Sequence, residues 1–290
     1  MRVLQNAAEY LAHAYEIPKN LPPLPLPDES FVSKWQEARG REVLDFLTYG
    51  LKLPAYEFVW RETERLSIYF AHTLGGTLPV IATSCHEDFR AMDAVLNGQE
   101  EERELPLTVN AFAIEARAKS IYRHRLLILN RAPYSNIPAE ALGLSTENWL
   151  ERSHQLRIRH ECAHYETLRL LGDMNNHALD EIIADALGQI AAFGNFDAKR
   201  QRLFFGLEAG QAVCTGRLSF YCKKVKPKER PKVYQAVNEV LENVNEELKK
   251  MISEGKGEIE MLMSLASKSI IERMECLTSG FLIKCIILNA

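Results

Sequence analysis

One short segment of this 290-residue chain carries residues whose types and spacing could bind a metal ion: Arg159-His160-Glu161-Cys162-Ala163-His164-Tyr165. A helix places residues i and i+4 about one turn apart on one face, so His160 and His164 can direct two imidazole nitrogens at one ion. Glu161 is rotated by about 100° from His160 on such a helix, so it need not be a ligand. It can instead accept a proton from a water molecule that the metal activates, which predicts a catalytic role for Glu161.

A catalytic zinc site needs three protein ligands and one open position, so two histidines are not sufficient. A turn-rich segment at residues 172–177 ends the first helix, and a second predicted helix carries Glu181 and Asp185 at i and i+4. If the two helices are antiparallel, Glu181 can be the third ligand. Asp185 can then accept the spare N–H of one histidine, which fixes the tautomer of that ring.

The residues around the two histidines predict that they point into the protein. One face of the helix carries Leu156, His160, Ala163, His164, Thr167 and Leu171, whereas another carries Arg152, Gln155, Arg159, Glu166 and Arg169. Two buried imidazoles without a metal or a partner would be costly. Cys162 falls on the polar side, and we expect it to be a spacer rather than a ligand.

The paired motifs His160-Glu161-x-x-His164 and Glu181-x-x-Ala184-Asp185 resemble those of the gluzincin metallopeptidases, and most closely the minigluzincin core shared with the CAAX-processing zinc proteases. This resemblance covers about residues 105–195. It implies one Zn²⁺ ion held by His160, His164 and Glu181, with Glu161 as general base in a hydrolase that cleaves peptide or protein substrates. It also implies that Asn110-Ala111-Phe112-Ala113 forms an edge strand beside the cleft, where an extended peptide could add by backbone hydrogen bonds.

Three points stay open in the sequence. Tyr134, His154 and His177 are candidates for a side chain that stabilises the transition state, but spacing selects none of them. A protein could keep the metal site for binding or regulation without proteolysis, or could hold the histidines as core residues without a metal. Glu161-x-x-His164 and Glu151-x-x-His154 also match the ligand pattern of di-iron carboxylate proteins, although both lie on one predicted helix.

The elements that must position these residues predict an α+β fold. Strands are expected at 56–60, 66–70, 79–82, 107–114 and 124–129, and the pair around Gly75-Gly76 has the character of a hairpin. Helices are expected at 1–16, from 28 or 30 to about 48, and at 87–97, 146–171, 178–194, 197–206, 209–224, 229–254 and 257–277. We therefore expect a small mixed sheet in the first half, packed on the active-site helix, and a mostly helical second half.

Three regions are expected along the chain: an N-terminal helix with a Pro-rich connector at 1–27, the metallopeptidase core at 28–195, and a C-terminal helical region at 196–290. Four prolines between residues 22 and 27 indicate a stiff extended connector. The basic run between Lys223 and Lys232 is interpreted as a solvated loop rather than an anion site.

Composition excludes several classes of protein. Lys plus Arg number 35 and Asp plus Glu number 39, which gives a net charge of −4 and argues against a dedicated nucleic-acid binder. No stretch has the length and apolarity of a membrane span or a signal peptide. The six cysteines form no Cys-x-x-Cys pair, so we expect reduced thiols in a cytoplasmic protein rather than a thiolate zinc site. The oligomeric state is not predicted.

Overall fold

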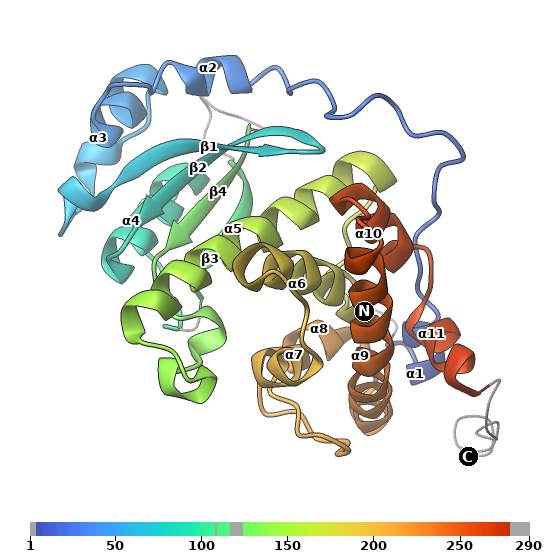
Figure 1. The fold of residues 1–290 in the computed structure, drawn as a ribbon. Coiled ribbons are helices and arrows are strands. Elements are labelled where there is room, and N and C mark those ends of the chain that lie inside the picture. Colours follow the sequence, from blue (N-terminus) through green and yellow to red (C-terminus); the bar gives the residue numbers. More distant parts are fainter. Residues whose placement is uncertain (1–3, 108, 117–123, 279–290) are drawn as a thin grey trace.

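A computed structural model describes the backbone of residues 4–107, 109–116 and 124–278 (Figure 1). Four strands form one mixed sheet in the order β1-β2-β4-β3: β1 (Ser67–Thr73), β2 (Gly76–Thr83), β3 (Ala111–Ala116) and β4 (His124–Asn130). β1 and β2 are an antiparallel hairpin, β2 and β4 are parallel, and β3 is antiparallel to β4. The predicted α+β fold, with a small mixed sheet in the first half and a mostly helical second half, is confirmed.

Helices cover both faces of the sheet, and its central strands are largely buried. Every residue of β2 is buried. Alternate residues of a strand point to opposite faces, and Ile81 and Ile128 accordingly pack with α4 (His86–Asn97), whereas Val80 and Leu129 pack against the long helix α5 (Thr146–Leu171). Figure 1 shows α5 running across the sheet toward the helical half.

The second half forms a separate apolar core around helix α6 (Ala178–Phe193), which is buried along nearly its whole length. The helices around it are α7 (Ala198–Phe205), α8 (Leu218–Tyr221), α9 (Arg230–Ser253), α10 (Glu258–Ala266) and α11 (Ile270–Thr278). The short N-terminal helix α1 (Ala7–Leu11) packs beside α9 and α11, and the Pro-rich connector then leads to the sheet side of the molecule (Figure 1).

Several predicted elements differ in the structure. The strand expected at 56–60 is a 3₁₀ turn, Ala55–Glu57, in which Trp60 donates its indole N–H to the Ala55 carbonyl. The helix expected at 1–16 is only α1. The helix expected before residue 48 is interrupted at Gly40, which adopts φ +74°, and consists of α2 (Val32–Gln36), α3 (Val43–Asp45) and a π turn, Phe46–Gly50.

Two helices predicted in the second half are also wrong in extent. Within 209–224 the only α-helix is the four-residue α8. The backbone of Gly216 lies against Gly206, and a Cβ added to Gly206 would lie 2.2 Å from the Gly216 nitrogen. The helix expected at 257–277 is split into α10 and α11, and Ser269 accepts the backbone N–H of Glu272 at the start of α11.

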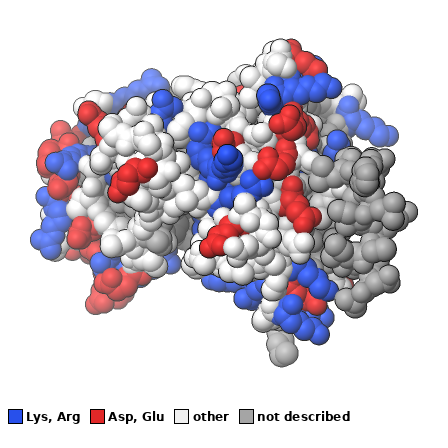
Figure 2. All heavy atoms as spheres, turned by 60° about the horizontal axis from the view of Figure 1, so that its bottom comes forward, with Lys and Arg blue, Asp and Glu red and all other residues white. Residues whose placement is uncertain are grey.

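Shorter helical turns connect these elements. They comprise the 3₁₀ turns Thr63–Arg65, Tyr134–Asn136, Ala139–Leu142, Cys222–Lys224 and Pro227–Glu229. Among the described helices, none is both long enough and apolar enough to cross a lipid bilayer. On the face shown in Figure 2, acidic and basic side chains are interspersed, so this face has no continuous surface of one sign.

Candidate metal centre

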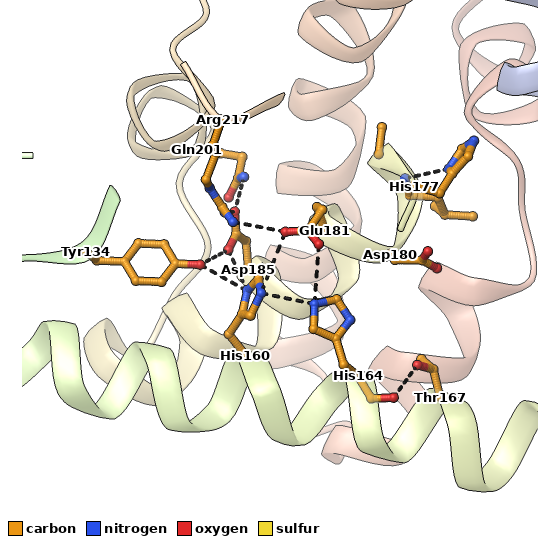
Figure 3. Close-up of polar contacts among 12 residues, drawn as sticks. Tyr134, His160, His164, Thr167, His177, Asp180, Glu181, Asp185, Gln201 and Arg217 are labelled. Carbon is orange, nitrogen blue, oxygen red and sulfur yellow. Dashed lines mark hydrogen bonds and ion pairs between the residues drawn. The ribbon is translucent and has the colours of Figure 1, made fainter. Parts of the chain in front are cut away.

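Helix α5 presents the two histidines of the motif to its neighbour α6. The helix begins at Ser145, whose hydroxyl accepts the backbone N–H of Asn148, and it ends at Gly172, which adopts φ +80°. His160 and His164 are only 5 % and 9 % exposed, and their Nε2 atoms lie 3.0 Å apart. The i, i+4 spacing therefore places both imidazoles at one point, away from solvent (Figure 3).

Helix α6 brings the third candidate ligand to the same point. Only residues 172–177 separate it from α5, so the two helices pack side by side in opposite directions. The contact is close: a Cβ on Gly188 would lie 2.8 Å from the Leu156 carbonyl oxygen. The Glu181 carboxylate consequently lies 3.4 Å from Nε2 of His164 and 3.6 Å from Nε2 of His160.

These three groups form the one set of potential metal ligands found among the described residues. Tetrahedral coordination with bonds of about 2.0–2.1 Å places neighbouring donor atoms about 3.3–3.4 Å apart. The two Nε2 atoms are 3.0 Å apart, and the Glu181 carboxylate approaches His164 to 3.4 Å through Oε1 and His160 to 3.6 Å through Oε2, so all three contacts are close to that value. His160, His164 and Glu181 therefore fit one face of a tetrahedral metal site.

Asp185 fixes the orientation of His160 from behind. Its Oδ1 accepts the Nδ1–H of His160 at 2.8 Å and the Tyr134 hydroxyl, and its Oδ2 accepts N–H groups of Gln201 and Arg217 (Figure 3). Burial alone would raise the pKa of Asp185, but Arg217, His160 and Gln201 hold it below its usual value. The ionised carboxylate keeps a proton on Nδ1 of His160 and leaves Nε2 free for a metal.

The charge of His164 responds to the carboxylates around it. Burial alone would lower the pKa of its imidazole. The hydrogen bond and charge of Glu181, together with the charges of Glu161 and Asp180, raise that pKa to about 9. Glu161 itself is half-buried, next to His160 on α5. In the absence of a metal the site thus favours a cation, which a divalent ion can supply in place of a proton.

The three candidates for transition-state stabilisation have other partners in the structure. The Tyr134 hydroxyl is 3.0 Å from Nδ1 of His160, on the side of the ring that faces Asp185. His154 pairs with Tyr69 of β1 at 3.1 Å. His177 caps α6 through Leu179 and stacks on Tyr10. None of the three is directed at the ligand atoms of the triad.

Arg217 and Gln201 were not identified from the sequence. Arg217 precedes α8 and donates to Glu181 at 2.9 Å and to Asp185, while its guanidinium lies over the Tyr134 ring at 5.1 Å from the centroid. Gln201 of α7 is fully buried. Neither residue belongs to a motif. Arg217 reaches the site from the segment between α7 and α8, whereas Gln201 reaches it from α7 itself. A half-buried cation that pairs with two buried carboxylates is the signal that only the structure provides.

The predicted edge strand lies at the end of the sheet. β3 pairs only with β4 among the described strands. The side chain of Asn110 is buried and engaged internally, since it donates to the Leu107 carbonyl and accepts from the amide of Asn130. Ala111 begins the strand, opposite Leu129. Phe112 continues it, but its side chain lies outside the described residues.

The position of Cys162 shows that the predicted polar side of α5 is wrong at this residue. The residue was expected on a polar side of α5, yet it is buried against the sheet with Val80 and Leu127. Glu166, expected on the same side, is also buried and pairs with Arg159 at 2.8 Å. The error arises because α5 is covered by the sheet on one side and by α6 on another. Cys85 and Cys222 are likewise buried free thiols, and Cys214 is half-buried.

Comparison with known proteins identifies one matching protein family, and the function of that family is unknown. The protein family described as "Family of unknown function (DUF7005)" matches residues 109–276, which is more than half of the chain and includes His160, His164 and Glu181. Neither the curated proteins nor the solved structures contain a significant match.

Proposed function

This chain belongs to the DUF7005 family, for which no function is established, and we propose that it is a zinc-dependent metallopeptidase. The observation that carries the proposal is the buried cluster of His160, His164 and Glu181, in which the two Nε2 atoms and the carboxylate oxygens approach one another to 3.0–3.6 Å and could hold one metal ion. The resemblance of the two motifs to those of gluzincins supports it, because it gives the same three residues as ligands.

Each residue of the site has a distinct part in the proposed reaction. His160, His164 and Glu181 would hold the zinc, which would supply a Lewis acid for activating water near neutral pH and polarising a carbonyl group. Glu161 accepts the proton of the attacking water and delivers it to the leaving amine. Asp185 keeps His160 in the tautomer that binds metal. Arg217 orients the carboxylates of Glu181 and Asp185 by pairing with both.

The position of β3 suggests how a substrate would bind. An edge strand offers unpaired backbone N–H and C=O groups that an extended peptide can use as a template. The Asn110 side chain is already hydrogen-bonded within the protein, so we propose that Asn110, Ala111 and Phe112 contribute through their backbone. This arrangement would give affinity for peptides of many sequences, with selectivity left to neighbouring side chains.

Replacing Glu161 by Gln tests the mechanism. We expect the E161Q protein to retain one zinc per chain and to lose peptide hydrolysis by about 10²–10⁴-fold, because the metal ligands remain and the general base does not. Hydrolysis is measured with a peptide library, with and without a chelator, and zinc by elemental analysis. The matched control is E147Q, which changes an exposed glutamate on the same helix. Unchanged turnover in E161Q would exclude Glu161 as the base.

A non-proteolytic metal-binding or regulatory protein is the second candidate. The observation in its favour is the closed character of the site, since all three ligands are nearly inaccessible to solvent and structural zinc sites have no open position. This candidate predicts one zinc per chain, a large fall in melting temperature after chelation and no hydrolysis of any library peptide.

The di-iron alternative lacks its second set of ligands. Glu151 is exposed and pairs with Arg131 at 3.0 Å, and His154 contacts Tyr69 on the sheet side of α5. These two residues do not join the triad. Elemental analysis distinguishes the cases, because the proposal predicts one zinc and the alternative predicts two irons per chain.

A further inference from the structure

A second candidate site lies between the sheet and the N-terminal half of α5. It is a cavity of about 370 Å³, lined by Arg65, Ser67, Tyr69, Ala82, Thr83, Ser84, Arg131 and His154. This volume is at the lower end of the range for small-molecule pockets. Most of these side chains are polar and several are hydrogen-bond donors, and no carboxylate is among them.

The fold places the cavity at the carboxyl ends of two parallel strands. β2 and β4 end at Thr83 and Asn130, and the backbone N–H of Arg131 donates to the Thr83 carbonyl at 2.8 Å, which continues their pairing. Parallel strand ends are a recurrent place for ligand sites, because the connections diverge there and leave a crevice. The positions of Thr83, Ser84 and Arg131 are thus set by the sheet itself.

Two arginines give the cavity a positive potential. Arg65 pairs with Glu62 and Arg131 pairs with Glu151, and both guanidinium groups are about half exposed. Such exposed ion pairs are weak, so an anion in the cavity can replace either carboxylate at little cost. The guanidinium group binds oxyanions with two parallel hydrogen bonds, whereas hydroxyls such as those of Ser67 and Ser84 donate single ones.

The pKa of His154, which lines this cavity, is lowered by burial and by nearby positive charges. Its Nε2 lies 3.1 Å from the Tyr69 hydroxyl, and its Nδ1 is buried without a hydrogen-bond partner among the described residues. Burial and the charges of Arg131 and Arg157 lower the pKa of His154 to about 4, against a smaller opposing effect of Glu151. The imidazole is therefore neutral at pH 7 and senses a net positive field.

We propose that this cavity binds the phosphate group of a small phosphorylated molecule. Arg131 and Arg65 supply the charge, and the exposed hydroxyls of Ser67 and Ser84 can complete the contacts to a group with several acceptor oxygens. The site is separate from the metal centre, because His154 and His160 are six positions apart and point about 120° apart around α5. The proposal is independent of whether the protein hydrolyses peptides.

Titration of the full-length protein with inorganic phosphate tests the proposal. Calorimetry is carried out at constant ionic strength, before and after treatment with a chelator, so that binding to a metal is recognised. We expect saturable binding in both conditions, and a Kd at least tenfold higher in R131Q because a bidentate charged contact is lost. E151Q frees Arg131 and should bind phosphate at least as tightly as the unaltered protein. The control K256Q removes a comparably exposed, ion-paired cation just before α10 and should leave the Kd unchanged.

A nuclear magnetic resonance titration of the imidazole of His154 gives a second readout. Phosphate beside Arg131 should raise the pKa of His154, since an added negative charge favours the imidazolium. Three results would overturn the proposal: no saturable binding up to about 10 mM phosphate, an equal Kd in R131Q and the unaltered protein, or an unshifted His154. Equal binding of acetate would overturn the phosphate assignment by showing that the cavity accepts any small carboxylate.

Discussion

Replacing Asp185 by Asn would test the role of this buried carboxylate in holding the metal. In the structure Asp185 receives four hydrogen bonds, including the Nδ1–H of His160 at 2.8 Å. Asn keeps the shape but removes the charge, and its amide can donate to Nδ1 and so favour the tautomer that carries a proton on Nε2. That proton would occupy the position of the metal.

The size of the effect follows from the bond that is lost. A hydrogen bond to a charged group contributes about 1.5–3 kcal/mol, and about 1.4 kcal/mol corresponds to tenfold in affinity. We therefore expect D185N to bind zinc about 10–100-fold more weakly, which is also the usual effect of removing such a partner. The assay is competition for zinc against a fluorescent chelator of known affinity.

A matched variant separates this effect from general disturbance of the site. Q201L removes one donor to Asp185 but leaves its charge, its bond to His160 and its pairing with Arg217. We expect its zinc affinity to fall by less than about threefold, because the tautomer of His160 is preserved. Circular dichroism and melting in chelator show whether each variant is folded. A folded D185N protein that binds zinc as tightly as the unaltered protein would refute the reasoning.

Two further predictions concern the helices that carry the ligands. G188A should lower the free energy of unfolding, measured by urea denaturation, by about 2 kcal/mol or more. The added Cβ would lie 2.8 Å from the Leu156 carbonyl oxygen and would push α6 away from α5. An unchanged free energy of unfolding would contradict the close contact between the two helices. Burial and the nearby charges lower the pKa of His177 to about 3, whereas an unfolded chain has a histidine pKa of about 6.5. The stability that the neutral ring provides is therefore present above pH 6.5 and is lost as the pH falls toward 3. Between pH 6.5 and pH 5 this amounts to about 2 kcal/mol, and H177N, which can still cap α6, should lose correspondingly less stability over that interval; equal losses in both proteins would show that His177 is not the titrating group.

Local patterns were sufficient to predict those elements that local interactions determine. The hairpin of β1 and β2 and the helices α5, α6 and α9 lie close to their expected bounds, because strong periodicity and terminal glycines such as Gly172 specify them. The strand expected at 56–60 failed for a physical reason: alternation of residue types predicts a strand only if a partner strand is available, and Tyr56 is exposed instead. The helix expected at 209–224 failed because the chain must pass close to Gly206.

Helix α5 is buried on two sides, whereas the sequence pattern predicts one buried side. Periodicity identified the side that carries His160 and His164, but it assigned Cys162 and Glu166 to solvent. Both are buried, because the sheet covers a second side of the same helix. A helix between two layers has two buried faces, and the polar residues on the second one are paired internally, as Glu166 is with Arg159.

The sequence by itself determined which residues are candidate metal ligands, because i, i+4 spacing on a helix is a local property that needs no tertiary information. It also determined that Glu181 and Asp185 share one face of the next helix. Only the tertiary structure decided that these two faces meet with donor separations of 3.0–3.6 Å. It alone placed Arg217 and Gln201 on the carboxylates and turned Tyr134 toward Asp185. Such contacts join segments distant in the chain, and their geometry is set by how layers pack, which no local pattern encodes.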